Sequence, residues 1–193
     1  MFRTYPDGEP IKLNDNTKLT LTSDLKNIRK INDKEINTFL NKIIDENAYM
    51  ATKKKKTLDH TKRQRKLNYE NIKNKQLIML YALSKNKVVG VLNVLRHNGN
   101  FDHVCGMGIT LKKEFRNKRL GTLLVTKSIN QIKETFKGIK IIELSVYENN
   151  LNAIHLYTNI GFQEVARIPK SLQWENNGKI ELKDKIIMHY YLV

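Results

Sequence analysis

The sequence predicts one α/β domain with a mixed β-sheet, antiparallel at first and parallel where a helix crosses over. Its 193 residues, 40% of them hydrophobic, suffice for one sizeable core. Two apolar runs, Leu77–Leu83 and Val88–Leu95, flank a short polar turn, which predicts a hairpin buried on both faces. The strand-like segments Phe101–Leu111 and Ile139–Val146 flank a segment of helical length, which indicates a crossover connection and parallel pairing.

The N-terminal segment is expected to lead into this domain. Residues 1–24 are polar and rich in turn residues, so we place the domain itself at residues 25–193. Within the lead-in, Lys18–Thr22 alternates like a short edge strand. We expect Leu25–Ile31 to be the first core strand.

Helices are expected where apolar residues recur at helical spacing. The first follows an N-cap at Asn32 or Asp33, and the second, Thr57–Lys73, is mostly polar and therefore exposed. A third ends near Phe136, before Gly138. The apolar faces of the first and third helices comprise Ile36, Phe39, Leu40, Ile43 and Ile44, and Leu120, Leu124, Val125, Ile129, Ile132 and Phe136.

The C-terminal part is predicted to add a short helix and the last strands. The helix covers about Asn150–Asn159 and stops at Gly161. Strands are expected at Phe162–Ile168 and Ile186–Leu192, and the run Asn177–Met188 is interpreted as part of a hairpin.

The charge of the chain favours an anionic partner. There are 35 Lys and Arg residues against 19 Asp and Glu, a formal net charge of +16. This favours nucleic acid, a ribosome or a phosphorylated cofactor, although a solvated basic surface explains the charge equally well. The single cysteine, Cys105, excludes an intrachain disulfide and a cysteine metal cluster. No apolar run reaches the ~20 residues of a membrane helix and no secretory signal is recognisable, so the expected location is cytoplasmic.

A basic turn precedes the third helix. Arg116, Lys118 and Arg119 lie where a strand gives way to the helix, with Gly121 just inside it. Free backbone N–H groups and the helix dipole at such a position attract anions. The turn matches neither a Walker loop nor a dinucleotide fingerprint. By itself it is equally compatible with an ordinary basic surface.

The short helix near the C-terminus carries a second motif. Asn150, Ala153 and Tyr157 share one face of it. Asn150 lies near the helix start, where its side chain can cap the helix or meet a ligand amide. Tyr157, taken alone, is better interpreted as core packing with a satisfied hydroxyl.

The two motifs in this order are far more specific than either alone. Arg-x-x-Arg-x-Gly after a strand, then a helix, a strand and Asn-x-x-Ala-Ile-x-Leu-Tyr-x-x-x-Gly-Phe, resembles the GNAT N-acetyltransferase superfamily. The resemblance implies a GNAT-like fold in which the fourth and fifth strands run parallel and splay into a cleft for acetyl-CoA. It also implies that backbone groups of the fourth strand bind the pantetheine and that the basic turn wraps the pyrophosphate. The implied contacts are Ile109, Thr110, Leu111, Arg116, Asn117, Lys118, Arg119, Leu120, Gly121, Thr122 and Asn150.

One position departs from the family pattern. Arg119 stands where the family usually has glycine. Because the loop binds mainly through N–H groups, the departure does not exclude binding.

The resemblance further implies acetyl transfer from acetyl-CoA to a primary amine by direct attack, without a metal. The acceptor is a small molecule, a lysine or a protein N-terminus. Tyr157 matches the family tyrosine near the thioester sulfur and is our candidate acid for the CoA thiolate. For the base, Glu143, His103 and Glu148 stay open, and Glu143 is the candidate that we carry forward. The family often forms homodimers.

Two other functions remain open at this stage. One is a non-catalytic acyl-CoA-binding or sensing module on the same fold. The other is a basic protein that binds nucleic acid or the ribosome, which the charge suggests but no motif supports.

Overall fold

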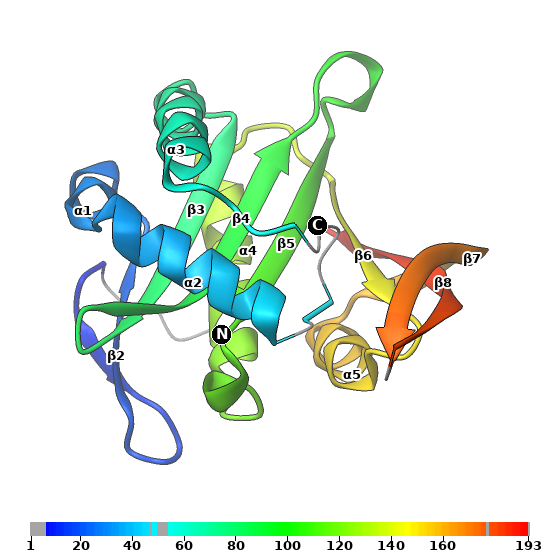
Figure 1. Ribbon diagram of the computed structural model, residues 1–193. Helices are drawn as coiled ribbons and strands as arrows, with labels where there is room; N and C mark the ends of the chain where they lie inside the picture. Colours follow the sequence, from blue (N-terminus) through cyan, green and yellow to red (C-terminus); the bar gives the residue numbers. More distant parts are fainter. Residues whose placement is uncertain (1–6, 47, 50–53, 177, 193) are drawn as a thin grey trace. The chain divides into compact units, whose positions relative to one another are not determined.

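The computed structural model describes residues 7–46, 48–49, 54–176 and 178–192 (Figure 1). The chain forms two compact units: residues up to Arg96 together with Gly108–Lys137, and His97–Met107 together with Gly138 onward. In the described residues the strands form a mixed eight-stranded sheet in the order β1-β2-β3-β4-β5-β6-β8-β7. Strand β5 (Val104–Leu111) runs through both units. The predicted mixed α/β fold is therefore confirmed.

The first unit contains the predicted hairpin. Strands β3 (Leu77–Ser84) and β4 (Lys87–Arg96) pair antiparallel, and the turn residues Lys85 and Asn86 have φ of 47° and 62°. Two successive positive φ values suit a tight hairpin whose twist matches that of its strands. Strand β2 (Lys18–Thr22) pairs with β3, and β1 (Pro10–Lys12) pairs with β2. The predicted strand at Lys18–Thr22 is thus correct, but the edge of the sheet is β1.

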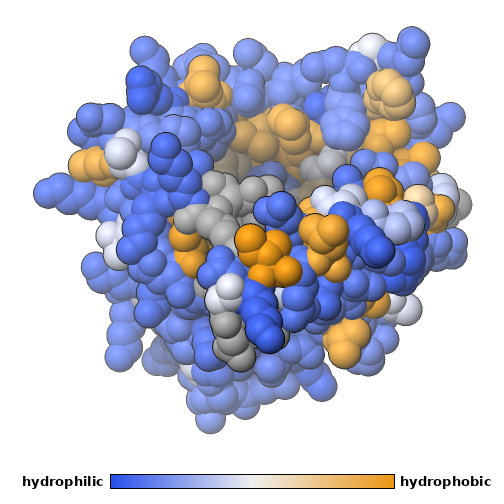
Figure 2. Space-filling model, turned by 45° about the vertical axis from the view of Figure 1, so that its right-hand side comes forward, coloured by the Kyte–Doolittle hydropathy of each residue, from blue (hydrophilic) through white to orange (hydrophobic). Residues whose placement is uncertain are grey.

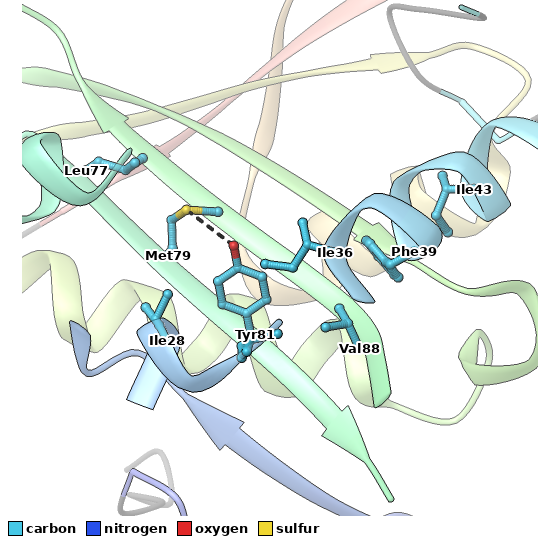
Figure 3. Packing of buried hydrophobic residues seen from close by; sticks show 9 residues of the cluster. Ile28, Ile36, Phe39, Ile43, Leu77, Met79, Tyr81 and Val88 are labelled. Atoms are coloured by element: carbon cyan, nitrogen blue, oxygen red, sulfur yellow. Dashed lines mark hydrogen bonds between the residues drawn. The ribbon is translucent and has the colours of Figure 1, made fainter. Parts of the chain in front are cut away.

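Both faces of the hairpin are covered, as its apolar runs predict. One face packs against helices α1 (Leu25–Lys30) and α2 (Asp33–Asp45), as Figure 3 shows. Helix α4 (Leu120–Thr135) lies against the other face, where Leu124 approaches Gly90. The buried hydrophobic residues between the hairpin and helices α1 and α2 are Ile28, Ile31, Ile36, Phe39, Ile43, Leu77, Met79, Tyr81 and Val88.

The prediction of a strand at Leu25–Ile31 is wrong, because this segment forms α1. The Asp24 carboxylate accepts the Asn27 N–H at 3.1 Å and caps the helix. Ile28 is the buried residue of α1. The Asn32 cap of α2 and the exposed helix α3 (Leu58–Lys73) are confirmed.

The second unit contains the crossover strand and the C-terminal hairpin. Strand β6 (Ile141–Tyr147) pairs parallel with β5 over Val104–Gly106 and antiparallel with β8 (Lys179–Tyr191) along its whole length. Helix α5 (Leu151–Ile160) follows β6, and Gly161 ends it in the left-handed conformation, with φ of 111°. Strand β7 (Gln163–Asn176) pairs with β8 and is much longer than predicted.

The surface is mostly polar. Figure 2 shows a face dominated by hydrophilic residues, as expected for a chain with 35 Lys and Arg residues. In the described part of the chain, no helix has the length and apolarity needed to cross a membrane.

Candidate functional site

Helix α4 in the first unit begins without a side-chain cap. Helices α1, α2, α3 and α5 are capped, because a side-chain oxygen accepts a backbone N–H of the first turn. The accepting residues are Asp24, Asn32, Thr57 and Asn150. At α4 the cap position is Arg119, a cation, and no described side chain caps the helix. The first N–H groups of a 16-residue helix and the positive end of its dipole therefore meet a basic turn. This is the arrangement that binds phosphate groups.

The backbone of the turn has the conformation that a glycine would favour. Arg119 has φ of 64° and ψ of 5°, and Asn117 has φ of 58°, both in the left-handed region. A residue with a Cβ pays about 1–2 kcal/mol for that conformation. Arg119 thus adopts a backbone conformation that glycine adopts without this cost.

Two of the three cations in this turn are held by the protein itself. Arg116 donates from Nε to the carbonyl of Leu111 at 3.0 Å and from Nη2 to Glu46 Oε2 at 2.7 Å. Lys118 Nζ lies 2.8 Å from Asp15 Oδ2, and its hydrogen bond lowers the pKa of that carboxyl. Arg119 is exposed. The turn therefore presents backbone N–H groups and Arg119, with Arg116 and Lys118 acting as braces.

Glu46 is a site residue that sequence reasoning missed. Its side chain is only 7% exposed, and Oε2 also accepts the N–H of Lys113 at 2.9 Å. One buried carboxylate thus fixes the start of the turn at two points and, through Arg116, the end of β5. Glu46 and Arg116 are 70 residues apart in the chain, so no local pattern links them.

The end of β5 carries the three residues predicted to bind pantetheine. Ile109, Thr110 and Leu111 are half-buried. A Leu111 methyl group would lie 2.6 Å from a Cβ added at Gly90, so a glycine is required there for this close approach. The Leu111 side chain at the end of β5 is therefore closely packed against β4.

In the second unit, Asn150 and Tyr157 occupy α5 as predicted. Asn150 caps the helix by accepting the Ala153 N–H at 3.4 Å. Tyr157 is 6% exposed, and its ring lies 5.5 Å from that of Phe162. Burial raises the pKa of the Tyr157 phenol to about 12. The phenol is therefore a proton donor throughout the neutral range and never a base there.

Glu143 has an imidazole partner that sequence reasoning did not identify. His189 of β8 lies opposite Glu143 of β6, and Nε2 is 2.9 Å from Glu143 Oε2. Gly106 of β5 lies opposite Glu143 on its other side, and a Cβ at Gly106 would meet His97 Nε2 at 3.2 Å. Because residues opposite each other share a face of a sheet, His97, Glu143 and His189 lie on one face of the second unit. A carboxylate hydrogen-bonded to an imidazole, as Glu143 is to His189, can accept and relay a proton.

Two buried phenols predict how stability depends on pH. Burial raises the pKa of both Tyr81 and Tyr157 to about 12, whereas an exposed phenol titrates near 10. The neutral phenols therefore stabilise the fold fully below about pH 10, and this contribution is lost as the pH rises to about 12. We expect the free energy of unfolding to fall by up to about 2–3 kcal/mol for each phenol across this window.

Urea unfolding at pH 9, 10 and 11 measures how the free energy of unfolding falls with pH. Tyr81→Phe and Tyr157→Phe should each flatten the fall in stability. An equally steep fall in both variants would show that other groups cause it.

Comparison with solved structures places this fold among acetyltransferases. An acetyltransferase of the GNAT family from Streptococcus pneumoniae aligns with a TM-score of 0.76 at 20% identity, over 90% of this chain and 99% of that one. YncA of Salmonella typhimurium, a putative acetyltransferase solved with its cofactor acetyl-CoA, aligns with a TM-score of 0.71 at 17% identity, over 91% and 94%. The ribosomal-protein-alanine N-acetyltransferase of Brucella melitensis aligns with a TM-score of 0.69 at 18% identity, over 89% of this chain and 99% of that one. At these identities the likeness establishes the fold.

The family follows from the sequence match. The acetyltransferase (GNAT) family model matches residues 44–162, more than half of the chain. No curated protein sequence matches the chain. The protein belongs to the acetyltransferase (GNAT) family, as the two motifs predicted.

Proposed function

We propose that this protein transfers the acetyl group of acetyl-CoA to a primary amine. The observation that carries the proposal is the uncapped start of α4 beside a basic turn, because four other helices of the chain are capped and this one offers its N–H groups to an anion. The residues present therefore suit the pyrophosphate of CoA. Bound acetyl-CoA would supply an activated thioester.

The basic turn and the end of β5 would hold the cofactor. Residues Arg116–Thr122 would bind pyrophosphate, chiefly through the N–H groups at the start of α4. Backbone groups of Ile109, Thr110 and Leu111 would bind the pantetheine. Asn150, whose Oδ1 caps α5, would contribute through the remainder of its amide.

Proton transfer falls to residues of the second unit. An amine attacks only as the free base, and a lysine amine has a pKa of about 10.4 in water, so a base must take its proton. We assign this to Glu143, with His189 hydrogen-bonded to it and able to pass the proton on. Tyr157, protonated at neutral pH, would return a proton to the departing CoA thiolate.

A substitution at Arg119 separates the backbone of the turn from its charge. Arg119→Gly should keep acetyl-CoA affinity within about threefold and raise the free energy of unfolding by up to ~1 kcal/mol, because glycine adopts positive φ without the Cβ penalty. Arg119→Ala keeps that penalty and removes the same charge. Calorimetric titration and urea unfolding of both variants measure the two effects.

A tenfold or greater loss of affinity in both variants would contradict this expectation. It would show that the Arg119 guanidinium, and not the backbone, carries the phosphate contact.

The function is tested by turnover. The protein is incubated with acetyl-CoA and a panel of amines: a lysine peptide, peptides with different free N-termini, a polyamine and small amino acids. Thiol release that depends on one acceptor, with mass spectrometry showing the acetylated amine, is the expected result. Saturable acetyl-CoA binding without acetylation of any acceptor would instead indicate a binding or sensing module.

A further inference from the structure

Helices α1 and α3 of the first unit together form a basic surface that the proposed acetyl transfer does not use. Buried Arg65 of α3 donates from Nη2 to the Ile28 carbonyl of α1 at 3.0 Å and also pairs with Asp33. Arg29 of α1 lies over the Tyr69 ring of α3, 5.4 Å from its centre. These contacts hold the two helices side by side, as Figure 1 also shows.

Exposed cations of α3 lie in line with Tyr69, the residue that Arg29 of α1 covers. Lys62, Lys66, Tyr69 and Lys73 are spaced by four, three and four residues, so they form one stripe along α3. Arg29 covers Tyr69 and so joins α1 to this stripe. The resulting cationic surface consists of exposed Lys26, Arg29, Lys30, Lys62, Lys66 and Lys73.

Most of this charge is not neutralised within the protein. Lys62 lies 4.0 Å from Asp59 and Lys73 lies 3.0 Å from Glu70. Among the described residues, the other four cations of the surface have no carboxylate within ion-pair distance. The surface thus combines a stripe from Lys62 to Lys73 on α3 with the exposed cations of α1.

The chemistry of the surface favours phosphates over other anionic partners. Stable protein interfaces are anchored by buried apolar or aromatic side chains, and the large exposed apolar residue of α3 is Leu67, which the helical spacing puts outside the stripe. Unstacked bases are bound by exposed aromatic rings, but Tyr69 is flanked by Arg29 and Arg65. Cations without apolar anchors or stacking rings are what the backbone of an intact duplex requires.

We infer that the cationic surface of α1 and α3 binds a nucleic-acid duplex through its phosphates, without reading its sequence. The inference is independent of acetyl transfer, because none of its residues belongs to the proposed site. The inference gives a function to six of the cations that make the chain strongly basic.

The experiment measures binding of the full chain to a labelled 24-base-pair RNA duplex and the matching DNA duplex between 50 and 200 mM salt. The test variant is Lys26→Gln/Lys30→Gln/Lys66→Gln. The matched control, Lys12→Gln/Lys18→Gln/Lys133→Gln, removes the same charge from exposed residues elsewhere in the first unit. Thermal unfolding and acetyl-CoA titration accompany each variant, and single Lys66→Gln replaces the triple variant if its fold is altered.

The expected result is at least a tenfold loss of duplex affinity at 100 mM salt in the test variant. The slope of log affinity against log salt should become shallower by up to about 2.7, which is ~0.9 for each phosphate that the variant no longer neutralises. The control should change affinity by threefold or less, RNA and DNA should bind alike, and acetyl-CoA affinity should not change. Equal losses in both variants, no loss in the test variant, or tighter binding of poly-glutamate than of either duplex would overturn the inference.

Discussion

Tyr157→Phe should lower the turnover number by about 100-fold while acetyl-CoA affinity stays within about threefold. Positioned acids commonly contribute about 10²–10⁴-fold, and the substitution removes the proposed proton donor while keeping the ring that packs against Phe162. The effect should appear in turnover because, in the proposed function, the hydroxyl protonates the leaving thiolate. Steady-state kinetics by thiol detection and calorimetric titration measure the two quantities.

Tyr81→Phe is the matched control for this prediction. Tyr81 is also a buried phenol whose pKa burial raises to about 12, but it packs in the first unit, with its hydroxyl 3.8 Å from the sulfur of Met79 (Figure 3). Its turnover should match that of the unaltered protein. If Tyr157→Phe also retains full turnover, Tyr157 is not the acid.

Arg116→Ala and Glu46→Ala should both weaken acetyl-CoA binding about tenfold, because each removes the brace that positions the basic turn. Arg116→Ala should also lower the free energy of unfolding by about 2–4 kcal/mol, since it leaves a buried carboxylate without its charged partner. Glu46→Ala should cost less, about 1–3 kcal/mol, because Arg116 is 35% exposed and can reach water. Titration with acetyl-CoA and urea unfolding measure both effects.

The double variant distinguishes a brace from a direct phosphate contact. If Arg116 acts through Glu46, the double variant should bind acetyl-CoA no more weakly than either single variant. If Arg116 contacts phosphate itself, Glu46→Ala should leave affinity unchanged while Arg116→Ala weakens it. Asp15→Ala, in the connection between β1 and β2, removes the exposed partner of Lys118 of the turn and is the control, with little expected change in stability.

Elements with a clear period and clear ends could be predicted from the sequence. The hairpin of β3 and β4 consists of two long apolar runs around a polar turn, and α4 carries a broad apolar face that ends before a glycine. Segment Leu25–Ile31 was misinterpreted because seven residues are too few to distinguish a helical period from a strand. Its apolar residues Leu25, Ile28 and Ile31, three apart after Asp24, fit the capped helix that forms.

The candidate site could be predicted only in its local parts. The basic turn and the α5 motif each lie within a few residues of sequence, so their order and spacing were enough to propose them as parts of one site. The pairs Glu46–Arg116 and Glu143–His189 join residues 70 and 46 positions apart, and the packing of β-strands and helices brings them together. The positive φ of Arg119 could not be predicted either, because an arginine rarely adopts it.

Calorimetric titration of the protein with acetyl-CoA, at low and at moderate salt, tests the central claim most directly. We predict saturable binding at one site, weakened but not abolished by salt because backbone N–H groups carry much of the pyrophosphate contact. We also predict that CoA lacking the acetyl group binds nearly as well, whereas pantetheine without the nucleotide binds much more weakly. The absence of acetyl-CoA binding at either salt concentration would contradict the proposed function.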